Sequence, residues 1–187
     1  MTLTRILSAS AALLAMPALA HTGHGTTVAT SFLEGILHPI TGLDHLAMLL
    51  GTGFIAAQVK SAQKQQMIML SALISLVAGM AVGALSGAFA AMETLILASV
   101  FIASFALMVQ KHSKSVLAAL VSVAMLAVHG WAHGVEAPAE GVTLFTFGML
   151  LGAGGIVLTG RYVGSHVPAK WLSPALGSSA LLLALAG

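Results

Sequence analysis

Long runs of apolar side chains, interrupted by very few charged residues, dominate this sequence of 187 residues. Hydrophobic residues make up 58% of the chain and charged residues 6%, and the mean hydropathy is +1.03. A soluble globular protein carries roughly 25% charged residues. A chain as apolar as this one cannot cover its surface with polar groups, so its solvent must be lipid.

The first twenty residues have the features of a secretory signal peptide. Arg5 supplies a positive charge, Ile6 to Leu14 form a short apolar run, and Pro17 precedes an Ala-x-Ala cleavage signal that ends at Ala20. The alternative is an uncleaved first transmembrane helix. We expect a signal peptide over residues 1–20 and a transport domain over residues 21–187, with the mature chain beginning outside the membrane at His21.

The remaining chain divides into about six apolar runs, each close to the roughly 20 residues that a transmembrane helix needs. They lie near Ser31–Ala57, Met67–Gly87, Met92–Val109, Val116–His133, Val142–Arg161 and Trp171–Ala186. Every Lys and Arg after the signal peptide falls in the first, third or fifth connector, which the positive-inside rule assigns to the cytoplasm. The sequence therefore predicts an all-α polytopic protein of the bacterial inner membrane, with its mature N-terminus in the periplasm.

Glycine residues recur every four positions in two of these runs. Gly79, Gly83 and Gly87 do so in the second run, and Gly148 and Gly152 do so in the fifth. Small residues at this spacing allow the backbones of two membrane helices to approach closely. We expect these glycines to serve packing.

The composition also argues against several classes of function. The chain has no Cys, which excludes disulfides, thiolate metal sites and a Cys nucleophile. The sequence has no glycine-rich phosphate-binding loop, so we do not expect it to hydrolyse ATP. The few basic residues lie in short connectors, where they act as topology signals and do not form a nucleic-acid surface.

A first polar cluster lies within the first apolar run and reads H-P-x-x-G-x-D-H-x-x-M. Its candidate ligands are His38, Asp44 and His45, with Met48 as a weak one. Ionisable groups at membrane depth are costly, and they are therefore candidates for function. His38 and His45 share a helix face if the helix continues through Pro39, although the proline and the following glycine predict a distortion.

A second cluster lies at the outer end of the fourth run and reads H-G-x-A-H-G-x-E. His129, His133 and Glu136 are spaced by four and three residues, which places them on one face of a helix. A single intramembrane His is more often a hydrogen-bonded packing residue than a ligand. Two clusters at similar depth favour one shared site.

Imidazole and carboxylate ligands without thiolate suit nickel, cobalt or zinc. Two other classes remain open at this point. A membrane metalloenzyme is one, because His129 and His133 resemble part of a His box, and a b-type cytochrome is the other, because His residues on two helices can ligate haem.

The two motifs together resemble those of the HupE/UreJ family of nickel permeases, and the resemblance extends over nearly the whole chain. It implies transport of Ni²⁺, with Co²⁺ as an alternative substrate, into the cytoplasm for hydrogenase or urease maturation. It also implies no resident cofactor and a transport site formed by His38, Asp44, His45, His129, His133 and Glu136.

The other histidines carry weaker expectations. His21 and His24 are accessory candidates for metal capture at the periplasmic mouth, or parts of a polar tail. His112 and His166 are expected in cytoplasmic connectors as ordinary loop residues. The sequence makes no prediction of oligomeric state.

Overall fold

The computed structural model describes residues 28–109 and 115–186, which form helices and short connections and contain no strand. The helices are α2 (Val28–Thr41), α3 (Leu43–Ala57), α4 (Ala62–Ser86), α5 (Met92–Val109), α6 (Ser115–Glu136), α7 (Val142–His166) and α8 (Ala169–Ala186). The predicted signal peptide, His21, His24 and His112 lie outside the described residues.

Five of these helices are long and apolar enough to cross a membrane, or six spans if α2 and α3, which are bent by 78° at the break between them, count as one. The predicted all-α membrane fold is confirmed. Several predicted boundaries were too short, because polar residues at the ends of the spans remain helical. The α4 helix begins at Ala62 rather than Met67, with Ser61 as its N-cap, and α7 continues to His166, so this residue ends a helix and does not lie in a loop.

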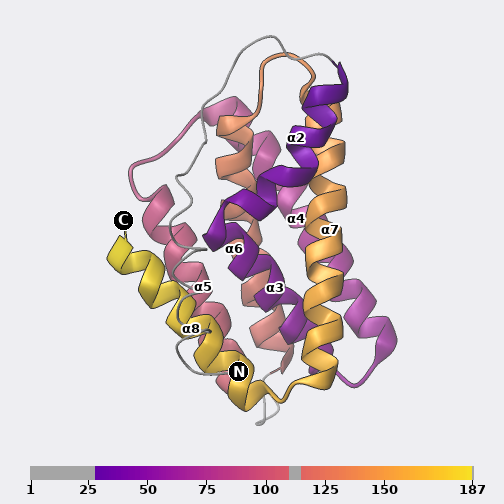
Figure 1. The fold of residues 1–187 in the computed structure, drawn as a ribbon, viewed down its shortest axis with the longest axis vertical. Helices are drawn as coiled ribbons and strands as arrows, with labels where there is room; N and C mark the ends of the chain where they lie inside the picture. The colour runs from indigo at the N-terminus through magenta and orange to yellow at the C-terminus, as the bar shows by residue number, and fades with distance from the viewer. Residues whose placement is uncertain (1–27, 110–114, 187) are drawn as a thin grey trace, which may run out of the picture.

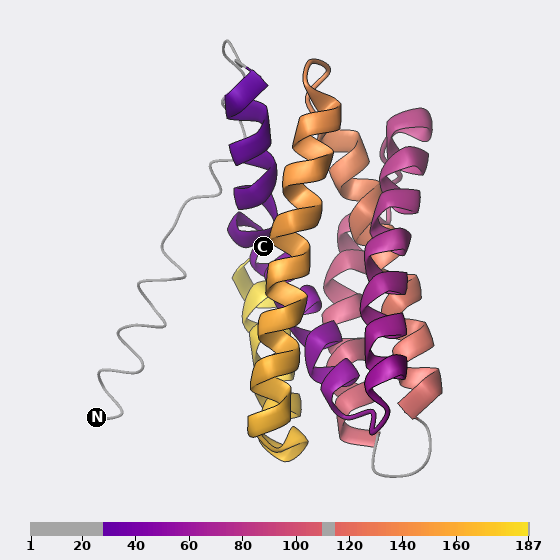
Figure 2. The same cartoon turned by 90° about the vertical axis from the view of Figure 1, so that its right-hand side faces the viewer.

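The helices run along the long axis of the molecule as a bundle (Figure 1). The main pairs are α4 with α6 and α5 with α8, and α7 packs against both α2 and α3. In Figure 2, α2 lies along one end of α7 and α3 along the other end. The core between the helices contains fully buried side chains such as Met48, Ile55, Leu76 and Met149.

Glycines set the distance between the paired helices. A Cβ added to Gly79 or Gly83 of α4 would overlap a backbone carbonyl oxygen of α6, and one added to Gly130 or Gly134 of α6 would overlap a carbonyl oxygen of α4. This reciprocal contact is the close approach that small residues permit in membranes. The packing expected of Gly79 and Gly83 is confirmed.

The other predicted glycines divide into two cases. Gly148 and Gly152 of α7 lie against backbone carbonyls of Phe32 and Ile36 in α2, so they also serve close packing. The expectation for Gly87 was wrong. It caps the C-terminus of α4 with φ 70°, and a Cβ there would meet nothing within 4 Å.

Charged side chains collect at opposite ends of the bundle. The described basic residues lie at the end formed by the α3–α4 and α7–α8 connections, namely Lys60, Lys64, Arg161 and Lys170. Arg161 Nε donates to Gln65 Oε1 at 2.7 Å and so joins α7 to α4 at this end. Glu34, Glu93, Glu136 and Glu140 lie at the other end, where α2, α5 and α7 begin and α6 ends.

Candidate metal site

The break between α2 and α3 places the first motif inside the bundle. The α2 helix passes through Pro39 and ends at Thr41, whose Oγ1 donates to the carbonyl oxygen of His38 at 2.9 Å. Gly42 is extended, with φ −83° and ψ 107°, and α3 begins at the next residue. His38 and His45 therefore belong to two different helices, so the condition for a shared helix face is not met, and the predicted distortion is confirmed.

Asp44 holds the imidazole of His45 in one orientation. Asp44 Oδ1 accepts a hydrogen bond from the backbone N–H of His45 and lies 2.7 Å from His45 Nδ1. A carboxylate only accepts, so Nδ1 carries the proton and Nε2 has the free lone pair. A Cβ on Gly42 would lie 3.0 Å from His45 Nδ1 and 3.3 Å from Asp44 Oδ1, which explains the glycine in the motif.

The α6 helix directs His129 and His133 into the bundle, where each is 1% exposed. The glycine that follows each of them, Gly130 and Gly134, lies against the backbone of α4. In the second motif each His is followed by a Gly, and the two residue types lie on neighbouring faces of α6. One face supplies imidazoles and the other allows α4 to approach closely.

The four imidazoles form a continuous row. Ring centroids are 4.7 Å apart for His38 and His133, 4.4 Å for His133 and His45, and 4.7 Å for His45 and His129. The row joins residues of α2, α6 and α3, and the break between α2 and α3 lies within it. The predicted association of the two motifs in space is therefore seen in the structure.

Glu136 and His38 form the outer end of this row. Their side chains are 48% and 27% exposed, and His38 Nε2 lies 3.2 Å from Glu136 Oε2. The potential ligand atoms of His38, His133 and Glu136 all lie within 4.8 Å of one another. This end combines one carboxylate and two imidazoles with access from the acidic end of the bundle.

Four buried imidazole nitrogens in this cluster have no hydrogen-bond partner among the described residues. They are His45 Nε2, His129 Nδ1 and both ring nitrogens of His133. Buried polar groups are nearly always hydrogen-bonded, because an unpaired one loses its interactions with water. A neutral imidazole has a lone pair on only one ring nitrogen, so His45, His129 and His133 can each offer one donor to a metal ion.

Met48 lies one turn after His45 but belongs to the hydrophobic core, and its side chain is fully buried. Thr52 follows one turn later, where its hydroxyl donates to the carbonyl oxygen of Met48 and lies 2.9 Å from Ser122 Oγ. Below the imidazoles, the space between α3 and α6 is therefore closed by a thioether and a pair of hydroxyl groups.

Sequence reasoning missed Ser99 of α5. Its Oγ lies 2.7 Å from His129 Nε2, and the residue is fully buried. Ser99 and Ser104 are the two serines of the apolar run Met92–Val109, and neither belongs to a motif, so nothing in the sequence signalled this contact. The partner of Ser99, His129, lies on α6, the next helix in the chain.

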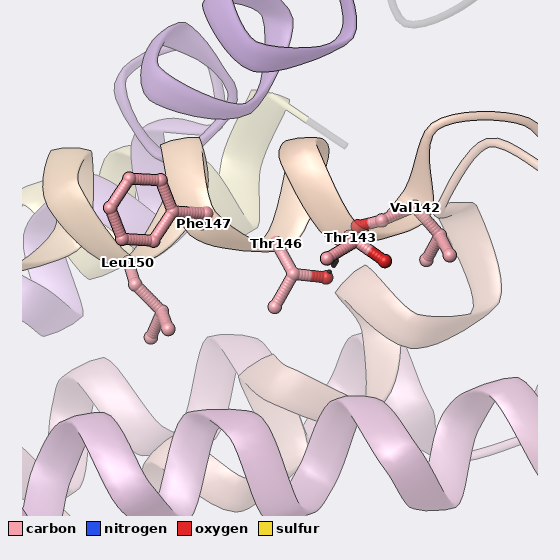
Figure 3. A pocket seen from close by; sticks show the side chains of 5 residues that line it. All are labelled: Val142, Thr143, Thr146, Phe147 and Leu150. Carbon is pink, nitrogen blue, oxygen red and sulfur yellow. Dashed lines mark hydrogen bonds between the residues drawn. The ribbon is translucent and has the colours of Figure 1, made fainter.

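Two other features lie away from the cluster. His166 is exposed at the end of α7, with Nδ1 2.8 Å from the carbonyl oxygen of Tyr162. A shallow hollow beside α7 is lined by Val142, Thr143, Thr146, Phe147 and Leu150, and the hydroxyl of Thr146 donates back to its own helix (Figure 3). Neither feature brings several imidazoles together, as the row of four histidines does.

Fold and cluster together describe a multi-pass helical membrane protein with a polar, imidazole-rich site inside its bundle. The chain belongs to the HupE/UreJ family, whose sequence model, described as HupE / UreJ protein, matches residues 9–187. It is 31% identical over 133 residues to Protein HupE of Rhizobium leguminosarum bv. viciae, covering 71% of this chain and 68% of that protein. No solved structure is significantly similar to it.

Proposed function

We propose that this protein is a permease that carries Ni²⁺ into the cytoplasm, where the metal supplies hydrogenase or urease maturation. A transport role is consistent with the HupE/UreJ family to which the chain belongs. The observation that carries the proposal is the group of four buried imidazole nitrogens without partners. Each of the three imidazoles concerned can offer one nitrogen lone pair to a passing metal ion.

The donor set supports nickel. The cluster offers imidazole nitrogens and carboxylate oxygens, and the chain contains no Cys. This chemistry suits Ni²⁺, Co²⁺ and Zn²⁺ and disfavours Cu⁺, which selects soft sulfur ligands. Met48 supplies the nearest sulfur in the motif, and its burial in the hydrophobic core argues for packing rather than coordination.

The arrangement suggests a route for the ion. Glu136 and His38 meet it at the accessible end, where the carboxylate attracts the cation and the imidazole replaces water. His133 shares ring contacts with His38 and His45, so it passes the ion from the outer to the inner part of the row. Asp44 holds His45 so that its Nε2 is available to the ion.

The direction of transport follows from the distribution of charge. Lys60, Lys64, Arg161 and Lys170 lie at the end of the bundle opposite to Glu136. The positive-inside rule assigns this basic end to the cytoplasm. The entrance formed by Glu136 and His38 then faces the periplasm, with the protein in the inner membrane and its mature N-terminus outside.

The ring contacts disfavour the two other functions that the motifs left open. The imidazoles pack directly against one another at 4.4 to 4.7 Å, which leaves no space for a haem between two of them. A metalloenzyme would need room for an organic substrate beside its metal, and the rings pack against one another there instead.

Metal uptake by cells that express the protein tests the proposal. Radioactive Ni²⁺ is supplied at low concentration with Co²⁺ or Zn²⁺ as competitors, and uptake is normalised to the amount of protein in the membrane. We expect Ni²⁺ uptake above that of cells lacking the protein, and the competitors show how far the site discriminates among divalent ions. Uptake no greater than in the control cells would contradict a nickel permease.

A further inference from the structure

Ser99 of α5 contacts His129, the innermost imidazole of the row, through its hydroxyl group. A hydroxyl group has one hydrogen and donates one hydrogen bond. Its Oγ lies 2.5 Å from the carbonyl oxygen of Ile96 and 2.7 Å from His129 Nε2. Serine and histidine are both fully or almost fully buried, at 0% and 1% exposure. Water therefore does not compete for either bond.

The proton arrangement follows from the two contacts. A carbonyl oxygen only accepts, so the hydroxyl hydrogen of Ser99 is used in the bond to Ile96. The remaining bond needs a hydrogen from the imidazole, and His129 Nε2 must donate it to Ser99 Oγ. In the neutral imidazole the other nitrogen, Nδ1, is then unprotonated and keeps its lone pair.

We infer that Ser99 is a positioning residue that fixes the tautomer and ring orientation of His129, so that Nδ1 is its metal donor. This inference rests on the proposed transport function for its metal-binding consequence. His129 Nδ1 is buried without a hydrogen-bond partner among the described residues, and the ring lies edge-on to His45. Partners of this kind orient metal-binding histidines in many proteins.

Ser99 orients His129 as Asp44 orients His45, but the two partners bind opposite ring nitrogens. Asp44 binds Nδ1 of His45 and leaves Nε2 free, whereas Ser99 binds Nε2 of His129 and leaves Nδ1 free. Both free nitrogens are among the buried atoms without partners. The two rings are neighbours, with centroids 4.7 Å apart, and each has one nitrogen without a partner among the described residues.

A hydroxyl of a helical Ser often bonds to the carbonyl oxygen three or four residues earlier, so the bond to Ile96 alone is an ordinary feature. The test must therefore separate positioning from packing. Ser99→Thr and Ser99→Val both introduce a branched side chain of similar shape, and Val has a methyl group where Thr keeps the hydroxyl. Ser104→Ala is a matched control on the same helix, because Ser104 bonds to the backbone of Ser173 in α8, away from the imidazoles.

Nitrogen-15 NMR of the metal-free, histidine-labelled protein gives the first measurement, with the His129 signals assigned by their loss in His129→Gln. We expect protonated Nε2 and unprotonated Nδ1 in the wild type, in Ser99→Thr and in Ser104→Ala, and a mixture of tautomers in Ser99→Val. A protonated Nδ1 in the wild type, or an unchanged tautomer in Ser99→Val, would overturn the inference.

Nickel titration of the same purified proteins gives the second measurement. Loss of a partner that orients a ligand typically weakens metal binding by about 10- to 100-fold, which we expect for Ser99→Val, with Ser99→Thr within a few-fold of wild type. Equal losses in both variants would show a packing role and overturn the inference. If the wild type bound no nickel while the tautomers behaved as expected, the proposed function would fail and the proton assignment would stand.

Discussion

Asp44→Asn should weaken nickel binding by about 10- to 100-fold, because the change removes a charged acceptor from His45 while keeping its shape. Asp44 Oδ1 lies 2.7 Å from both the backbone nitrogen and Nδ1 of His45. A hydrogen bond to a charged group contributes about 1.5–3 kcal/mol. Since each 1.4 kcal/mol corresponds to about a tenfold change in affinity, the loss of one such bond gives the stated range.

A double-mutant cycle shows whether Asp44 acts through His45. If its main role is to hold this imidazole, Asp44→Asn should have little further effect in a His45→Ala background. The coupling free energy would then be about 1.5–3 kcal/mol, nearly the whole effect of Asp44→Asn alone. The assay is nickel titration of the four purified proteins in detergent, with fluorescence-detected size-exclusion chromatography as a check of folding.

Glu93→Gln is the matched control, because Glu93 is an exposed carboxylate in the first turn of α5 and contacts none of the imidazoles. It should leave nickel affinity unchanged. The reasoning would be refuted if Asp44→Asn lowered affinity equally with and without His45. The carboxylate would then act on the metal directly rather than by orienting the imidazole.

Three further predictions concern packing, the buried thioether and orientation. Gly130→Ala should destabilise the protein by about 1–3 kcal/mol through overlap with the α4 backbone, whereas Gly155→Ala, where a Cβ meets nothing within 4 Å, should leave the melting temperature unchanged. Met48→Leu should keep nickel affinity within a few-fold, since the side chain lies in the hydrophobic core, and a large loss would make its sulfur a ligand. Reporter fusions after Lys64 should show a cytoplasmic location and those after Glu140 a periplasmic one, and the reverse result would invert the proposed direction.

The arrangement of spans was largely predictable because hydropathy reports directly on burial in lipid. The predicted bounds of Met92–Val109 agree with α5. The errors occurred where a helix extends beyond its apolar run, as α7 does from Arg161 to His166. Polar side chains at a membrane surface are solvated whether or not their backbone is helical, so hydropathy does not mark such an end.

The sequence predicted which residues gather at the candidate site but not how the helices bring them together. The spacing of His129, His133 and Glu136 on one helix needs only the helical repeat, and this part of the geometry agrees with the structure. Pro39 and Gly42 signalled a distortion, yet a bend of 78° depends on how α2 and α3 pack against α7, which the sequence does not encode locally. Ser99 was missed because its contact with His129 depends on the packing of α5 against α6.

The central claim is that the row of imidazoles carries nickel through the protein, and transport in purified proteoliposomes tests it most directly. Wild type and His133→Ala are reconstituted at equal protein amounts, and entry of radioactive Ni²⁺ is followed under an inward nickel gradient. His133 has no hydrogen-bond partner among the described residues, so its removal leaves no described polar group unpaired. We predict uptake by the wild type and none above empty liposomes for His133→Ala. Equal uptake by both proteins, or none by the wild type, would contradict the account.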